Sequence, residues 1–141
     1  MNRQSHRPPT VLAFSQSDGW TLHAVAVAAG DGAAPLEAIV AAGDASNHAV
    51  FRPDELSDCL GRLLSAGLVV RSGDQYAPAP EVGARLGRGG LSRQRDTAEQ
   101  LVEQAGVRSL AVSGEAPSEA ASERALAAYL RLAARSAGRA V

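Results

Sequence analysis

Few residues in this chain combine side-chain type and spacing in a way that suggests chemistry. Asp44, Asn47 and His48 form a polar group, from which Asn47 and His48 could contact DNA or a ligand. Asp and Asn also satisfy exposed backbone groups where a helix ends, and we favour this interpretation, with His48 packed or solvated. His6 lies in a polar tail and His23 in an apolar helix, so no two histidines have the spacing of a metal site. We expect no metal and no other cofactor.

A catalytic nucleophile is not expected either. Cys59, the single cysteine, lies between Leu56 and Leu60 on an apolar stripe, whereas a reactive thiolate needs exposure and a basic neighbour. No serine has the nucleophile-elbow pattern, and the Gly-rich residues 87–90 lack the Lys-Ser/Thr ending of a phosphate loop. The sequence therefore predicts that the protein is not an enzyme.

The elements that would position functional residues are clearest between Phe51 and Pro80. Pro53 fits the first position of a helix, and Gly67 can adopt the left-handed conformation that ends one. The apolar residues between them recur at helical spacing and predict one buried face: Leu56, Cys59, Leu60, Leu63 and Leu64. Two short strands, residues 68–71 and 75–77, then flank the turn residues 72–74, and Pro78 and Pro80 end the pairing.

This helix and hairpin resemble the third helix and wing of a winged helix-turn-helix domain. The pattern Leu-x-x-Leu-x-x-x-Gly-Leu-Val of bacterial transcriptional regulators occurs here as Leu60, Leu63, Gly67, Leu68 and Val69. The resemblance covers about Trp20 to Pro80. It implies a mainly α fold with a small antiparallel β-hairpin, followed here by two C-terminal helices.

The remaining elements are expected from caps and breakers. We predict a first helix from Trp20 to Ala29 capped by Ser17 or Asp18, and a second from Pro35 to about Gly43 followed by a polar turn. Further helices are predicted at 92–105 and 118–136, with a short strand at 107–112 between them. The predicted organisation is a mobile tail and lead-in at 1–16, a winged-helix domain at 17–80, a flexible Gly/Arg-rich connector at 81–91, and C-terminal helices at 92–141.

The predicted core and the predicted interface follow from the apolar stripes. We expect Trp20 to be buried together with Leu60, Leu63, Leu64, Leu68 and Val70. The last helix carries its own stripe, formed by Ala125, Leu126, Tyr129, Leu132 and Ala133. This stripe either packs within a monomer or meets a second copy, and we favour a homodimer formed with the helix of Trp20. Arg124, Arg131 and Arg135 would then lie at the solvated edge.

The amino-acid composition is compatible with a folded globular protein but does not indicate nucleic-acid binding. The 141 residues are 45% hydrophobic and carry a net charge of −1. Residues 19–80 have three arginines against seven acidic residues, and residues 81–141 have nine against seven. The part that resembles a DNA reader is therefore the acidic part, although DNA binding needs a local excess of cations.

Candidate DNA contacts follow from the resemblance. The predicted outward face of the third helix offers Ser57, Arg62 and Ser65, the hairpin offers Arg71 and Gln75, and the connector offers Arg85 and Arg88. Asp54 and Asp58 on the same helix face would repel phosphate, and acidic residues in a first turn also complement the helix dipole with no DNA present. The connector arginines could equally belong to a solvated loop.

Three functions remain compatible with the sequence. The first is a DNA-binding transcriptional regulator that acts as a homodimer on double-stranded DNA. The second is a winged-helix protein-interaction module without DNA affinity. The third is a small-molecule-sensing domain with a pocket between the C-terminal helices and the core. The sequence has no apolar run of signal-peptide or membrane-span length, and its single cysteine cannot form an internal disulfide. We therefore expect a cytoplasmic protein.

Overall fold

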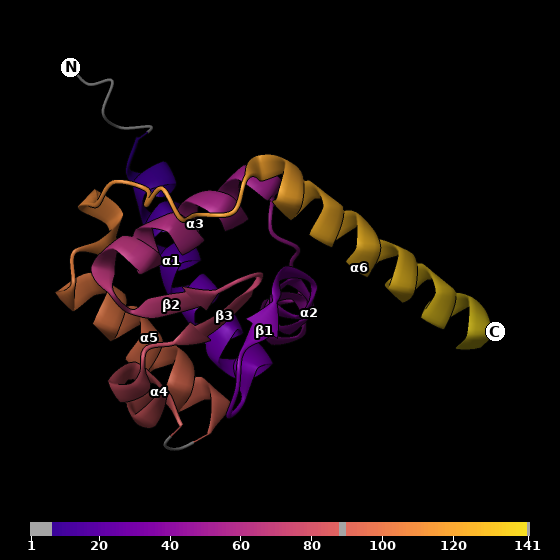
Figure 1. The fold of residues 1–141 in the computed structure, drawn as a ribbon, viewed down its shortest axis with the longest axis horizontal. Coiled ribbons are helices and arrows are strands. Elements are labelled where there is room, and N and C mark those ends of the chain that lie inside the picture. The colour runs from indigo at the N-terminus through magenta and orange to yellow at the C-terminus, as the bar shows by residue number, and fades with distance from the viewer. Residues whose placement is uncertain (1–6, 88–89, 141) are drawn as a thin grey trace.

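The computed structural model describes residues 7–87 and 90–140, with side chains at 17–87 and 90–136. The predicted fold class is confirmed, because the described residues form a mainly α protein with a small antiparallel sheet (Figure 1). In chain order the elements are α1 (Arg7–Ala29), β1 (Ala34–Pro35), α2 (Leu36–Asn47), α3 (Pro53–Ala66), β2 (Val69–Ser72), β3 (Gln75–Pro78), α4 (Pro80–Leu86), α5 (Leu91–Gln104), the 3-10 turn η2 (Val107–Ser109) and α6 (Glu119–Ala140).

Helix α3 and the hairpin agree with the sequence-based prediction. α3 begins at Pro53, and the Glu55 carboxylate accepts a hydrogen bond from the Arg52 backbone N–H at 3.1 Å. The helix ends at Gly67, whose φ of 74° is left-handed. Gly73 has a φ of 61° in the turn between β2 and β3. Local start, stop and turn residues therefore define this part of the fold.

The hairpin gains a third strand that the sequence did not predict. β1 pairs antiparallel with β3, so the strand order is β1-β3-β2. Within the hairpin Val69 pairs with Pro78 and Arg71 with Tyr76. Side chains alternate across this sheet, so Val69 is buried at 2% exposure while Val70 is 46% exposed. The prediction that Val70 belongs to the core is therefore wrong.

Helix α1 is the centre of the protein, since it packs against α2, α3 and α5. Leu22 and Val25 on α1 are fully buried, as are Leu60 and Leu63 on α3. Residues 7–16, predicted to belong to a tail and lead-in, are part of α1, which begins at Arg7. The prediction that Ser17 or Asp18 caps the start of this helix is therefore wrong. Both of these residues lie inside the helix, and their side chains are used for contacts with α3.

Helix α2 continues through Gly43 to Asn47, four residues past the predicted end. The glycine remains helical because two aromatic rings lie against it. Trp20 and Phe51 stack with ring centroids 3.9 Å apart, and the Trp20 indole N–H donates to the Gly43 carbonyl at 3.0 Å. A Cβ at position 43 would lie 2.5 Å from the Phe51 ring. Trp20 is half-buried in this stack rather than fully buried.

Two further predictions are corrected in the C-terminal half. Residues 80–86 of the predicted connector form α4, which Pro80 opens at a position where its missing N–H costs nothing. Residues 107–109 form a 3-10 turn rather than the start of a strand. The helix predicted at 92–105 is confirmed as α5, and the last helix begins after Ser118, whose hydroxyl accepts the Ala121 N–H at 3.0 Å.

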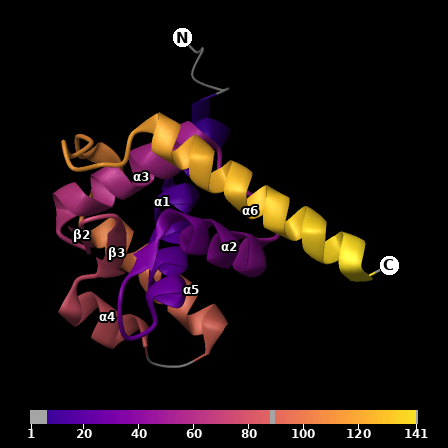
Figure 2. The same ribbon diagram turned by 45° about the vertical axis from the view of Figure 1, so that its right-hand side comes forward.

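Helix α6 packs on α3 and α2 through its first half only. Ala125 and Leu126 are buried and Tyr129 is half-buried, whereas Leu130 and Leu132 are 52% and 55% exposed. Both ribbon views show its C-terminal half projecting beyond the body of the protein (Figures 1 and 2).

Candidate functional site on the outer face of α3

The predicted DNA contacts on α3 centre on one face of this helix. Ser57, Gly61 and Ser65 are four residues apart and therefore lie one above another. In the structure residues 110–118, here called the covering segment, run along α3 and lead into α6 (Figure 1). Ser57 and Gly61 are buried beneath this part of the chain, whereas Ser65 at the C-terminal end of the face is exposed.

Backbone groups of the covering segment bind directly to α3. The Ser65 hydroxyl donates to the Ala111 carbonyl at 2.7 Å, and the Ser113 N–H donates to the Gly61 carbonyl at 3.0 Å. A Cβ at position 61 would lie 2.2 Å from Val112 Cγ1, so only glycine permits this approach.

The third residue of the face fixes the start of α6. Ser57 is buried, and its hydroxyl contacts the Ser118 carbonyl at 3.1 Å and the Ser122 hydroxyl at 2.7 Å. Ser122 is fully buried as well. A hydroxyl that is committed to two internal partners is not available to DNA, so the prediction that Ser57 faces outward is wrong.

Arg62 also points inward. Its Nη2 lies 2.8 Å from Asp18 Oδ1 on α1, and the two side chains are 5% and 1% exposed. The guanidinium also lies 3.4 Å from the Cys59 sulfur. The prediction that Arg62 contacts DNA assumed an exposed side chain, and its place in this buried ion pair corrects that assumption.

Cys59 is buried, as predicted. Burial raises the pKa of its thiol far above the ordinary value, and the negative charge of Asp18 adds to this effect. The thiolate form is therefore strongly disfavoured, which removes the cysteine as a nucleophile.

The hairpin residues differ in their surroundings. Arg71 donates from Nε to the Gly73 carbonyl at 2.7 Å and from Nη1 to the Glu115 carbonyl of the covering segment. Its guanidinium carbon also lies 5.4 Å from the centre of the Tyr76 ring. Gln75 is exposed on β3. The hairpin arginine is therefore engaged by the same segment that covers α3.

Of the two predicted connector contacts, the structure describes Arg85, which belongs to α4, away from α3 (Figure 1). Arg85 is exposed in the last turn of α4. Arg88, the other predicted connector contact, lies outside the described residues. The structure thus does not bring the predicted DNA contacts together on one exposed surface.

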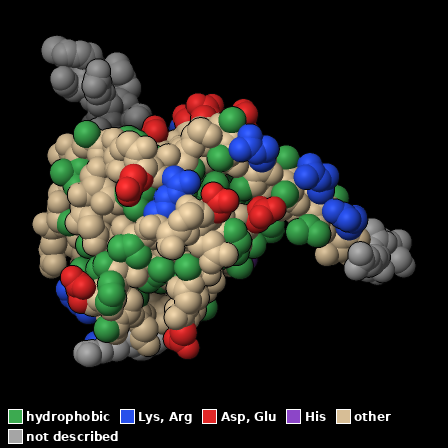
Figure 3. Space-filling view, viewed as in Figure 1, with side chains coloured by type: hydrophobic (Ala, Val, Ile, Leu, Met, Phe, Trp, Pro, Cys, Tyr) green, Lys and Arg blue, Asp and Glu red, His purple; other side chains and the backbone are tan. Residues whose placement is uncertain are grey.

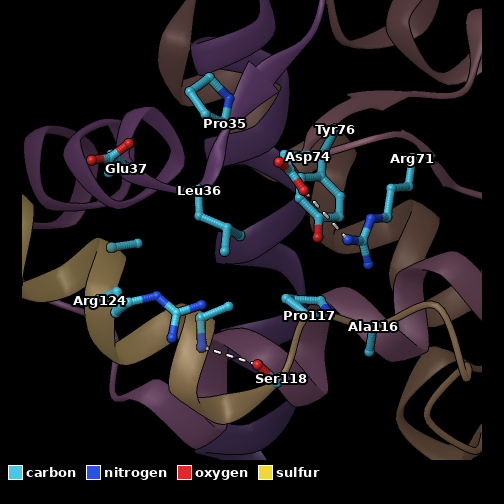
Figure 4. Close-up of a pocket in the computed structure, with 12 residues that line it drawn as sticks. Pro35, Leu36, Glu37, Arg71, Asp74, Tyr76, Ala116, Pro117, Ser118 and Arg124 are labelled. Carbon is cyan, nitrogen blue, oxygen red and sulfur yellow. Dashed lines mark hydrogen bonds and ion pairs between the residues drawn. The ribbon is translucent and has the colours of Figure 1, made fainter.

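A cleft of about 510 Å³ lies between the sheet, the start of α2 and α6. Figure 4 shows Arg71 on one side, Arg124 on the other, and Leu36 between them. Glu37 and Asp74 also line the cleft, so its two arginines face two acidic residues. This balance favours no charged ligand class.

The polar group around Asp44 has a structural role. The Tyr129 hydroxyl of α6 donates to Asp44 Oδ2 at 2.5 Å, and this hydrogen bond raises the pKa of Tyr129. His48 is exposed and ends α2 with a left-handed φ of 54°. Asn47 is exposed beside it.

The described residues contain no group of three or more His, Cys, Asp or Glu side chains that could hold a metal ion. Over the same residues, no helix is both long enough and apolar enough to cross a membrane.

Comparisons with protein-family models, with curated proteins and with solved structures found no match to this chain. The covering segment was not predicted from the sequence, although the sequence contains one signal for it. Ser57, Gly61 and Ser65 form a stripe of small residues on one helix face, and such a stripe permits the close approach of another backbone.

Proposed function

We propose that this chain is a winged-helix protein that functions through protein–protein contact, with a second copy of itself as partner, and does not read DNA with α3. The element order α1, β1, α2, α3, β2, β3 supports the winged-helix interpretation, because the third helix is followed directly by the hairpin. The observation that carries the proposal is that residues 111–122 bury part of the outer face of α3. A recognition helix must present its side chains to the major groove, but Ser57 and Gly61 are buried, and the hydroxyl of the exposed Ser65 donates to the Ala111 carbonyl.

The partner surface is the projecting half of α6. Leu126 is buried against the body, and Leu130 follows it by four residues. Tyr129 is half-buried, and Leu132 and Ala133 lie three and four residues after it. The apolar stripe therefore continues past the point where the body ends, and leucines on a projecting helix favour a partner that covers them.

The opposite face of α6 is basic. Helical spacing places Arg124, Arg131 and Arg135 away from the apolar stripe, and all three are exposed. In Figure 3 basic side chains form a row along one edge of the projecting helix and hydrophobic side chains line the other. This amphipathic pattern suits a helix that pairs with its own copy about a two-fold axis, the commonest symmetry of oligomers.

Analytical ultracentrifugation tests whether the partner is a second copy of this chain. The wild-type chain should sediment near twice its mass of 14.5 kDa at micromolar concentration, and a chain with both Leu130→Glu and Leu132→Glu should be monomeric. The control Arg131→Glu changes the net charge by the same two units on the opposite face and should remain dimeric. Equal monomer masses for all three chains would overturn the dimer.

A DNA-binding regulator is the second candidate, favoured by one observation. Arg85 at the end of α4 and Arg93 near the start of α5 are both exposed, on helices that follow each other in the chain. A titration with duplex DNA at low salt separates the two candidates. The interaction protein should show no binding. Binding lost only in an Arg85→Gln, Arg93→Gln double variant would support the second candidate, and binding lost in Arg71→Gln would restore the hairpin and α3 as the DNA site.

A further inference from the structure

A second pocket, distinct from the cleft beside α6, lies between α1, the last turn of α2 and the first turn of α5. Its volume is about 290 Å³, and it is lined by His23, Ala45, Ser46, Leu91, Ser92 and Arg95. The lining contains one arginine and no carboxylate. Its size is at the lower end of ligand pockets, which limits an occupant to a small molecule or ion.

The imidazole of His23 is buried beside this pocket, and its two ring nitrogens are not both hydrogen-bonded. It is 1% exposed, and neither ring nitrogen has a hydrogen bond of ordinary geometry among the described residues. The Gln94 side chain interacts with the imidazole, yet one amide can engage only one of the two nitrogens. A buried nitrogen without a partner costs free energy, and a ligand in the pocket would provide the missing partner.

Arg95 brings positive charge to the same place. Its Nη2 donates to the Ser46 carbonyl at the end of α2. A guanidinium has five N–H donors in a fixed fork, so this single bond leaves capacity for an oxyanion. The bond also holds the guanidinium at the pocket.

The first turn of α5 adds backbone donors. Gly90 precedes the helix and offers no side-chain cap to the first N–H groups. The first N–H groups of a helix have no partner within the helix, and together with the positive end of the helix dipole they favour an anion at this position. Leu91 and Ser92, which belong to this turn, line the pocket.

We propose that this pocket binds a small oxyanion, either a carboxylate or a phosphate group, held by His23, Arg95 and the first turn of α5. The imidazole donates one N–H, the guanidinium supplies charge-assisted hydrogen bonds, and the helix start supplies backbone N–H groups. Burial lowers the pKa of His23 and the charge of Arg95 adds to this effect, while the interaction with Gln94 opposes it. The site is independent of the proposed partner surface on α6.

Calorimetric titration with sodium phosphate, with sodium acetate and with sodium chloride at equal ionic strength tests the site. Phosphate or acetate should bind saturably with one site per chain, and chloride should not. Binding of phosphate alone or of acetate alone identifies which oxyanion fits. Arg95→Gln should weaken the binding at least about tenfold, because a charge-assisted contact is lost. The control Arg93→Gln removes the same charge from the same helix turn, outside the pocket lining, and should change the affinity less than about twofold.

Histidine side-chain NMR of the wild-type chain keeps the test independent of whether the variants fold. The imidazole signals of His23 should shift as the oxyanion is added, while those of the exposed His48 should not. Unchanged His23 signals, or an equal loss of affinity in Arg95→Gln and Arg93→Gln, would overturn the proposal.

Discussion

The carboxylate of Asp18 and the guanidinium of Arg62 are 2.8 Å apart in the protein interior, although 44 residues separate them in the sequence. This pair joins α1 to α3, and the neighbouring Ser17 hydroxyl donates to Glu55 Oε2 at 2.5 Å across the same contact. Both charges have lost their water, so each depends on the other for compensation. The pair thus fixes the orientation of α3 against the central helix and leaves Arg62 unavailable to DNA.

Removing one member of this pair should destabilise the protein strongly. Arg62→Gln leaves the Asp18 carboxylate buried without its counter-charge, and we expect a loss of about 3–5 kcal/mol in the free energy of unfolding. Urea denaturation followed by the fluorescence of the single tryptophan, Trp20, measures the loss. The exposed pair of Arg52 and Asp54, with side chains 74% and 54% exposed, provides the control. Arg52→Gln should cost less than about 1 kcal/mol, and equal losses in the two variants would contradict the assignment.

Gly61→Ala should destabilise the protein even though alanine is normally the better helix former. A glycine-to-alanine change inside a helix usually stabilises by about 0.5–1 kcal/mol. Here the new Cβ would meet Val112 at 2.2 Å, so the covering segment must move away from α3. Hydrogen exchange of the Ser113 amide, which donates to the Gly61 carbonyl, should become faster.

Gly83→Ala in α4 is the matched control for Gly61→Ala. Its Cβ would lie 3.5 Å from Pro78, an ordinary contact, so the usual stabilisation should appear. The double variant Gly61→Ala, Val112→Ala should recover part of the loss, because the clashing methyl groups are removed. A stabilised Gly61→Ala single variant would mean that residues 110–118 do not lie on α3 in solution.

The sequence predicted the elements whose limits are set by their own residues. Pro53, Gly67 and Gly73 act within one turn of themselves, so α3 and the hairpin were predicted correctly. Gly43 was misinterpreted as a helix end because the rings that pack on it, Trp20 and Phe51, come from elsewhere in the chain. Local glycine rules fail where tertiary contacts stabilise the helix.

The predictions that Ser57 and Arg62 face solvent were wrong for the same reason, because residues far away in the sequence bury them. Helical spacing identifies which residues share a face of α3, but it does not identify what covers that face. Arg62 was predicted to face solvent because it lies off the apolar stripe of α3, but its partner Asp18 is 44 residues away in the sequence. Residues 111–118 accept the hydrogen bonds of Ser57 and Ser65 through backbone carbonyl groups. Every residue has such a group, so the sequence carries no pattern that reveals these contacts.

The stability of the protein should fall in mild acid because of His23. Burial lowers the pKa of this imidazole from its ordinary value of 6.5, with Arg95 contributing in the same direction and Gln94 against it. Above about pH 6.5 the imidazole is neutral in both states, and His23 adds no pH dependence. Below this pH the unfolded chain takes up a proton that the folded chain resists, so stability is lost until the folded pKa is reached. The slope from this group is at most about 1.4 kcal/mol per pH unit.

Denaturation midpoints measured between pH 7.5 and pH 5 test this dependence, and His23→Gln should reduce its slope below pH 6.5. The same substitution at the exposed His48, His48→Gln, provides the control. A slope that persists in His23→Gln would assign the acid sensitivity to other groups.

The two halves of α6 should differ in hydrogen exchange, and only the outer half should depend on protein concentration. The inner half is fixed to the body by the Ser57–Ser122 contact at 2.7 Å and by the Tyr129–Asp44 hydrogen bond at 2.5 Å. Residues 131–136 are all exposed. An unsupported stretch of roughly ten helical residues is marginal in water, so these amides should exchange quickly in a monomer.

If two copies pair through Leu130 and Leu132, the outer half of α6 becomes protected as the concentration rises through the dissociation constant. Exchange followed by mass spectrometry at two concentrations, on the two sides of the sedimentation transition, measures this protection. The amides of α5 serve as an internal reference, because that helix packs within its own chain against α1. Protection that is the same at both concentrations would mean that the outer half of α6 does not form the interface, and the leucines on it would need a different partner.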